Sequence, residues 1–256
     1  MKIKTTKHPH ILSSNHHIIQ QSPINMPAYS EFEFKNGMLY DYASNNFPTR
    51  LHAWNSDLSL QTEGSTWFGY VFEGETQVTT AHNEWTLHER QFFSFNHPIE
   101  LSGGRGIVIE RLDFRGSNVC GGPVEDWGRL KYIDGCTDSL LIPPVKMGDP
   151  CLNALFFPEN IDQTAHTHPS MRVGMVIEGA GSCVTPEREY ELAPGKIFII
   201  HEEGNHKFKT ADDQRLTVIA YHPDSDFGPV DEDHPMINRT IVDGVSAREI
   251  DEIRTK

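Results

Sequence analysis

The chain has 256 residues, enough for one large domain or two smaller ones that each bury a core. Its 36 Asp and Glu outnumber 22 Lys and Arg, and a net charge of −14 would repel a phosphate backbone, so we expect no nucleic-acid partner. No apolar run approaches the roughly 20 residues that a membrane helix needs, and residues 1–7 do not lead into an apolar signal core. We therefore expect a cytoplasmic protein without a membrane partner.

Short runs of β-branched and aromatic residues, separated by Gly, Pro and Asp, recur along the chain. No long helical periodicity competes with them, so the sequence predicts an all-β fold. The runs are residues 66–72, 107–114, 172–177, 196–200 and 216–221. The four cysteines show no CxxC spacing, and in a cytoplasmic chain they are expected to be reduced thiols.

Three histidines in the second half of the chain form a candidate metal site. His166 and His168 are two residues apart, so on a strand they point to the same face, and His206 from a later strand can complete the site. Three neutral imidazoles suit iron, manganese, nickel, copper or zinc. We predict that these histidines bind one divalent transition metal.

The same residues resemble the two motifs of the cupin family, whose members are small β-barrels or jelly rolls. The first family motif is His-x-His followed by Glu and then Gly, and residues 166–179 match it except that Arg172 stands at the usual Glu position. The second motif is Pro-Gly, a hydrophobic run, Gly and His, and residues 194–206 match it. The resemblance implies a metal-binding cupin barrel.

The chain also repeats itself at a constant offset. Residues 69–74 (GYVFEG) lie over residues 174–179 (GMVIEG), and residues 84–87 (EWTL) lie over residues 189–192 (EYEL). A repeat of one barrel-sized unit predicts two stacked cupin barrels. The first copy has lost the metal ligands, because the positions of His166, His168, Arg172 and His206 are taken by Gln61, Glu63, Trp67 and Leu101. Trp67 and Leu101 predict an apolar cavity and a structural role for this copy.

These observations set the expected domain boundaries. We expect an N-terminal arm at residues 1–25, a degenerate barrel at 26–120, a Gly- and Pro-rich linker at 121–150, a metal-binding barrel at 151–223 and a tail at 224–256. The linker is also a candidate for an extended strand that pairs across the domains. In the tail, Ser246 and Glu249 have the spacing of a capping box, which predicts a short helix. The tail is expected to lie over the surface or on a partner subunit, and exposed edge strands favour a homodimer.

Two further residues are predicted to take part in catalysis. The alternation that turns His166 and His168 inward also turns Arg172 inward, where its guanidinium can hold a carboxylate or phosphate bidentately. The alternatives are a solvated strand residue and a substitution that marks a second copy losing its metal. Tyr221 and His222 end the last strand of the second barrel, and alternation lets only one of them face the pocket. We favour Tyr221, as a donor of a proton or a hydrogen bond.

Three protein ligands on a six-coordinate ion leave open positions for a chelating substrate and, with Fe(II), for dioxygen. A three-histidine site without Glu is similar to that of the thiol dioxygenases and of a diketone-cleaving dioxygenase among the cupins. The resemblance implies an Fe(II) dioxygenase that acts on a small anionic molecule. Two alternatives stay open: a non-oxidative metal-dependent lyase, isomerase or hydrolase, and a small-molecule binding protein without catalysis.

Overall fold

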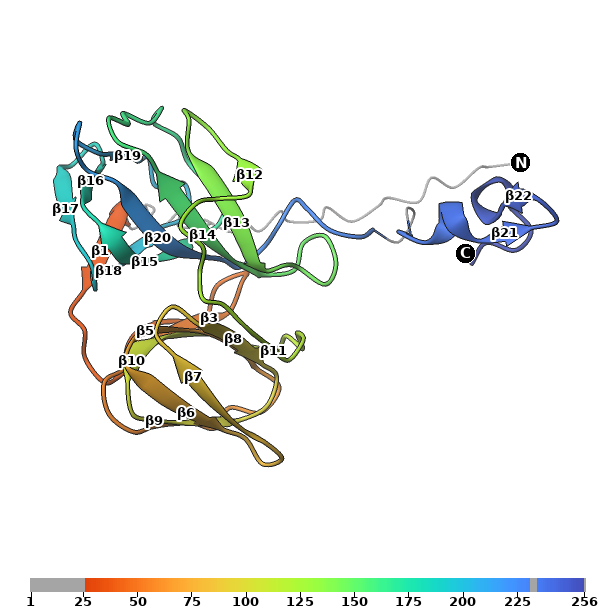
Figure 1. Ribbon diagram of the computed structural model, residues 1–256, viewed down its shortest axis with the longest axis horizontal. Helices are drawn as coiled ribbons and strands as arrows, with labels where there is room; N and C mark the ends of the chain where they lie inside the picture. The colour runs from red at the N-terminus through yellow and green to blue at the C-terminus, as the bar shows by residue number, and fades with distance from the viewer. Residues whose placement is uncertain (1–25, 231–233, 256) are drawn as a thin grey trace, which may run out of the picture.

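The strands of the chain form two β-barrels, which are drawn one above the other in Figure 1. The computed structural model describes residues 26–230 and 234–255, so the expected N-terminal arm lies outside the described residues. The two helices found there are single 3₁₀ turns, and neither is long or apolar enough to cross a membrane. The predicted all-β, two-barrel fold is confirmed.

The first barrel consists of a six-stranded and a four-stranded antiparallel sheet. Along the six-stranded sheet the strands are β11 (Val119–Gly121), β8 (Phe92–Phe95), β5 (Thr66–Glu73), β10 (Arg105–Arg111), β3 (Thr49–Trp54) and β2 (Gly37–Tyr42). Along the four-stranded sheet they are β4 (Leu58–Leu60), β9 (Ile99–Ser102), β6 (Glu75–Thr79) and β7 (Glu84–His88).

The second barrel has a similar arrangement, with seven strands in its large sheet and three in its small one. Its seven-stranded sheet has the order β1 (Tyr29–Phe32), β18 (Ile197–Ile200), β15 (Arg172–Gly179), β20 (Leu216–His222), β14 (Cys151–Phe157), β13 (Thr137–Ile142) and β12 (Leu130–Lys131). Its smaller sheet consists of β17 (Glu189–Leu192), β16 (Gly181–Val184) and β19 (Lys207–Lys209). β5 and β15, and likewise β8 and β18, hold equivalent places, as the sequence repeat predicts.

β1 and β13 depart from the expected boundaries, and the short strand β12 departs with β13, its pairing partner. β1 precedes the first barrel in sequence, yet it pairs with β18 of the second barrel. β13 lies within the expected linker, yet it pairs with β14 and extends the second barrel's large sheet. Both strands satisfy the backbone donors and acceptors of an otherwise open sheet edge, which explains why they leave the positions that a simple linear division assigns them.

The central strands of the two large sheets are buried on both faces. On β15, Gly174 and Val176 face the interior of the second barrel, whereas Val173 and Met175 pack in the core between the barrels. Phe68 of the first barrel meets Tyr221 of the second, with ring centroids 5.3 Å apart. The usual alternation of apolar and polar residues is therefore absent from these central strands.

The end of the chain forms a small unit that stands apart from both barrels in Figure 1. It contains β21 (Ile241–Val242), β22 (Val245–Ser246) and the 3₁₀ turns η1 (Ile237–Arg239) and η2 (Ala247–Glu249). The predicted helix is η2, where the Ser246 hydroxyl accepts a hydrogen bond from the Arg248 backbone at 3.3 Å. In Figure 1 this unit does not lie over the barrels, and the other alternative, that the tail lies on a partner subunit, stays a prediction.

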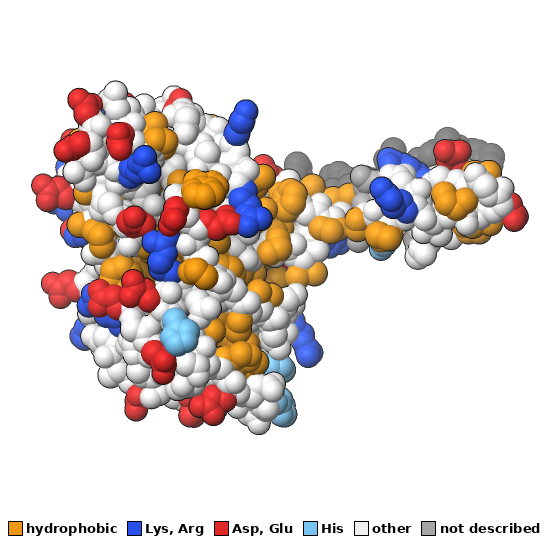
Figure 2. Space-filling view, in the orientation of Figure 1, with side chains coloured by type: hydrophobic (Ala, Val, Ile, Leu, Met, Phe, Trp, Pro, Cys, Tyr) orange, Lys and Arg blue, Asp and Glu red, His pale blue; other side chains and the backbone are white. Residues whose placement is uncertain are grey.

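The surface carries many acidic side chains, as the net negative charge of the sequence indicates, and the cysteines form no disulfide. On the face drawn in Figure 2, acidic side chains are spread over both barrels with Lys and Arg scattered among them. All four cysteines are free thiols, and Cys183 is a buried residue of the second barrel's core.

Candidate metal centre

The backbone brings the three histidines together at one end of the second barrel. His166 and His168 lie on the extended segment between β14 and β15, and His206 lies directly before β19. His166 and His206 form an antiparallel bridge, with N–H···O distances of 2.9 and 3.0 Å in the two directions. The backbone carbonyl of His168 accepts a bond from the Glu203 N–H at 2.8 Å, which fixes the segment to the same turn.

The three imidazole rings converge on one point. Their centroids are 5.0 Å apart for His166 and His168, 4.6 Å for His166 and His206, and 5.2 Å for His168 and His206. One ring nitrogen from each residue lies within 4.8 Å of the other two. Three nitrogens at such separations can share one transition-metal ion.

Hydrogen bonds from two of the rings orient them as ligands. His166 Nδ1 donates to the Thr164 carbonyl at 2.8 Å, and His206 Nδ1 donates to the Gly204 carbonyl at 2.9 Å. A proton held on Nδ1 leaves the Nε2 lone pair free, as in most metal-binding histidines. Thr164 is itself fixed by Asp134, whose carboxylate accepts from the Thr164 N–H at 2.7 Å.

The surroundings keep two of the rings neutral. Burial, aided by the neighbouring Arg172 and histidines, lowers the pKa of His168 to about 3. Burial also lowers the pKa of His206 to about 4, against an opposing bond to the Gly204 carbonyl. Neutral imidazole is the form that binds metal, so the donor set fits a divalent transition metal.

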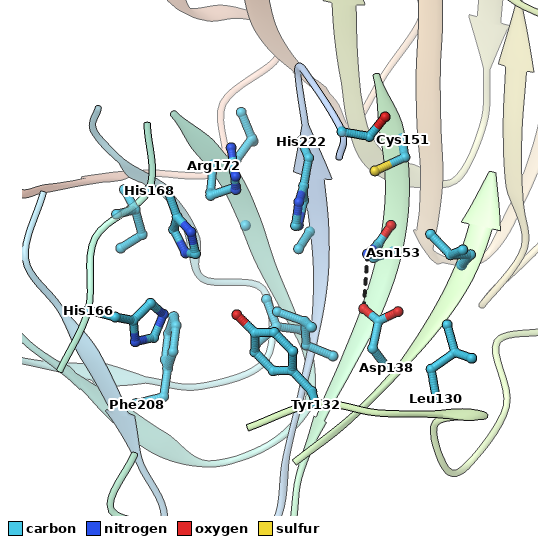
Figure 3. Close-up of a pocket in the computed structure, with 18 of the residues that line it drawn as sticks. Leu130, Tyr132, Asp138, Cys151, Asn153, His166, His168, Arg172, Phe208 and His222 are labelled. Carbon is cyan, nitrogen blue, oxygen red and sulfur yellow. Dashed lines mark hydrogen bonds between the residues drawn. The ribbon is translucent and has the colours of Figure 1, made fainter. Parts of the chain in front are cut away.

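The histidines line a cavity of about 540 Å³ inside the second barrel (Figure 3). Its wall follows strand alternation: on β14, β18 and β20 the residues that face it are two apart. The wall is mostly apolar, with Leu140, Leu155, Phe157, Phe198, Phe208 and Val218 among its residues. A volume of this size accommodates a small organic molecule.

Arg172 faces this cavity, as the strand alternation predicts. Its side chain is 14% exposed, and Nη1 lies 3.4 Å from Asp224 Oδ1. Nη1 also donates to the Met171 carbonyl at 3.0 Å and to the Ser170 carbonyl and hydroxyl, and that hydroxyl donates to Asp224. Among the described residues Nη2 makes no such bond, so one edge of the guanidinium remains available to a ligand.

Tyr221 does not face the cavity, and the prediction that it does is wrong. Its side chain is fully buried in the core between the barrels, where it packs on Phe68. The neighbouring residue His222 lines the cavity instead. The parity of β20 decides this outcome, because Val218, Ala220 and His222 share the inward face.

Several polar residues of the cavity were missed by the sequence reasoning. Tyr132 precedes β13 and points its hydroxyl towards the histidines in Figure 3. Asp138 on β13 and Asn153 on β14 lie on the opposite side of the cavity from His166 and His168. The first two belong to the segment that was expected to be a linker.

The first barrel has other residues at the positions of the triad. Gln61 and Glu63 are exposed, whereas Trp67 and Leu101 are buried in the apolar core. Its cavity is not fully closed, however, because a hollow of about 380 Å³ remains beside Trp67 and the buried Glu110. Among the described residues, the second-barrel triad is the one cluster with metal-binding geometry.

Comparison with known proteins agrees with the fold. Residues 159–231 match the family model of the AraC-like ligand-binding domain. A cupin 2 conserved barrel domain protein from Leptotrichia buccalis is 12% identical, with a TM-score of 0.52, and the match covers 78% of this chain and 90% of that one. A protein from Pseudomonas aeruginosa, named as a candidate glyoxylate-induced protein, is 13% identical with a TM-score of 0.57, over 79% and 86% of the two chains.

A third similar structure is an enzyme. It is a variant of salicylate 1,2-dioxygenase from Pseudoaminobacter salicylatoxidans in complex with gentisate, 9% identical with a TM-score of 0.52, and the match covers 68% of this chain and 67% of that one. No curated protein sequence matches this chain significantly. At these identities the likeness shows a shared fold, which is the cupin barrel.

Proposed function

Because the chain has the double-barrel fold of the cupin superfamily, we propose that it is a metal-dependent enzyme, and most specifically an Fe(II) dioxygenase for a small anionic metabolite. The observation that carries the proposal is the convergence of His166, His168 and His206 on one point at the end of an apolar cavity. The carboxylate usual in the cupin motif is absent, since Arg172 holds its position.

The three histidines would hold the ion through their free ring nitrogens. An Fe(II) ion held by these three ligands would have positions left for a chelating substrate and for dioxygen. Three neutral ligands leave the full positive charge of the ion in the cavity, which favours an anionic substrate. The bonds to the Thr164 and Gly204 carbonyls keep two of the rings in the orientation that this requires.

Arg172 would anchor the substrate. Its Nη1 is fixed to Asp224 and to main-chain carbonyls, so the guanidinium is held in place before any ligand enters. The free Nη2 edge can then donate to a carboxylate oxygen with little further loss of side-chain entropy. Tyr132 replaces Tyr221 as the proposed donor of a hydrogen bond or proton, because its hydroxyl points into the cavity.

Oxygen uptake tests this proposal. Tag-free protein would be stripped of metal, reloaded with Fe(II) without air, and mixed with small carboxylates, of which salicylate and gentisate are the first choices. A dioxygenase places both atoms of O₂ in its product, so we expect one O₂ consumed per substrate lost and a product heavier by two oxygen atoms. His168→Ala should abolish the uptake. Substrate turnover that continues without oxygen would contradict the dioxygenase and favour a lyase, isomerase or hydrolase.

A small-molecule binding protein without catalysis is the second candidate. It is favoured by the match of residues 159–231 to the AraC-like ligand-binding domain, since this segment includes the triad, Arg172 and His222. Recovery of a tightly bound ligand unchanged after long incubation with metal-loaded protein and air would support binding alone. The homodimer, the cytoplasmic location and the absence of nucleic-acid and membrane partners remain predictions.

A further inference from the structure

A pair of buried polar side chains on one wall of the cavity is not used by the proposed function. Asp138 on β13 is 8% exposed and Asn153 on β14 is 7% exposed. The Asn153 amide donates to Asp138 Oδ2 at 3.0 Å, and both residues line the same cavity as the histidines. Figure 3 shows the pair across the cavity from His166 and His168, with the Tyr132 ring between them.

The pair has one acceptor without a donor and one carboxylate without a cation. Asn153 Oδ1 is buried without a hydrogen-bond partner. Among the described residues no Lys, Arg or His nitrogen lies within ion-pair distance of the Asp138 carboxylate. The titratable groups that do interact with Asp138 are Tyr132 and Cys151, and neither supplies a positive charge. A buried carboxylate without a cation and a buried carbonyl without a donor are both costly to fold.

We propose that Asp138 and Asn153 form a subsite for a protonated amine of the ligand. An ammonium group has three donors and one positive charge. It can therefore form an ion pair with the Asp138 carboxylate and donate a hydrogen bond to the Asn153 amide oxygen at the same time. A neutral hydroxyl would satisfy one acceptor and leave the charge unpaired. Desolvation raises the pKa of Asp138 to about 6, so the carboxyl is still largely ionised at neutral pH.

The arrangement defines the class of ligand. The histidines and Arg172 receive an anionic group at one side of the cavity, and the Asp138 pair receives a cationic nitrogen at the other, within a wall that is mostly apolar. The ligand is then a small zwitterion with an apolar middle. This inference rests on the proposed function for the anionic end, whereas the amine subsite itself consists only of protein groups.

Matched pairs of simple compounds test the subsite. Binding to Zn(II)-loaded and to metal-free protein would be measured by calorimetry for γ-aminobutyrate against pentanoate, ε-aminocaproate against heptanoate, and p-aminomethylbenzoate against p-ethylbenzoate. In each pair a methyl group replaces the ammonium group. For the pair whose length spans the cavity, we expect the amine to bind about tenfold to hundredfold more tightly, the range for a charged hydrogen bond.

Two variants separate the specific contact from a general effect of charge. Asp138→Asn should remove the preference for the amine, and thermal melting will verify that this conservative variant is folded. Asp226→Asn removes the same charge from an exposed residue at the mouth of the cavity and should keep the preference. The proposal is overturned if no pair shows a preference or if the preference survives in Asp138→Asn. The metal-free measurement tests the amine subsite independently of the metal site. If the protein fails to bind zinc, that result contradicts the proposed metal site and not the amine subsite.

Discussion

Replacing Asp138 with Asn should stabilise the protein at pH 8 and have little effect near pH 4. Burial raises the pKa of this carboxyl from 3.8 to about 6. The folded protein therefore keeps the proton up to about pH 6, whereas the unfolded chain loses it near 3.8. The cost of burying the charge is absent below the lower value and complete above the upper one. Since one pKa unit corresponds to about 1.4 kcal/mol, the full cost is about 3 kcal/mol.

Urea denaturation followed by tryptophan fluorescence at several pH values measures this effect. The free energy of unfolding of Asp138→Asn should exceed that of the wild type by about 1–3 kcal/mol at pH 8, and the difference should shrink as the pH falls through 6. Asp212→Asn, at an exposed position, is the control and should show no such trend. An unchanged or lower stability of Asp138→Asn at pH 8 would refute the view that this carboxylate is buried without compensation.

Three further changes test the packing around the site. Phe68→Ala should lower the free energy of unfolding by about 3–5 kcal/mol in urea titrations, because the ring is buried between the barrels against Tyr221; a loss below about 1 kcal/mol would count against a shared core. Tyr221→Phe should leave the metal content, measured by elemental mass spectrometry, unchanged, because the side chain lies outside the cavity. Loss of metal would show that Tyr221 contributes to the metal site. Gly179→Ala should reduce thermal stability far more than Gly148→Ala, because both have positive φ but only at Gly179 would a Cβ lie 1.8 Å from the Arg215 carbonyl; equal losses would exclude that clash.

The metal triad could be predicted from the sequence because its spacing is set by local backbone geometry. His166 and His168 are two residues apart on an extended segment, and a turn at Gly204 directs His206 back to them. The repeat was equally informative, since β5 and β15 lie at equivalent positions in their sheets. Features that depend on residues close in sequence, such as the histidine spacing and the repeat, could therefore be predicted.

The orientation of Tyr221 could not be predicted for a physical reason. In a sheet with one solvent-exposed face, the polar residues of a strand point outward, and their positions indicate which residues point inward. β20 is buried on both faces, with Ile219 and Tyr221 against the first barrel and Ala220 and His222 in the cavity. The choice between Tyr221 and His222 depends on the pairing of β20 with β14 and β15, which the sequence does not reveal.

Long-range pairing also explains the missed residues. Thr137–Ile142 has the composition of a strand, but the Gly- and Pro-rich sequence around it led to the assignment of a linker. Asp138 meets Asn153 only because β13 joins the second barrel's sheet. In the first barrel, Glu110 is buried beside Ser65 and Arg50, partners that are far away in sequence. Such contacts follow from topology and not from local pattern.

The metal content of tag-free protein tests the central claim most directly. Elemental mass spectrometry would compare wild type, His168→Ala and Gln61→Ala, the last being the equivalent position in the first barrel. The account predicts about one equivalent of a divalent transition metal in wild type and in Gln61→Ala, and its loss in His168→Ala. Metal that remains in His168→Ala, or wild-type protein that takes up no iron, manganese, nickel, copper or zinc, would contradict a metal centre in the second barrel.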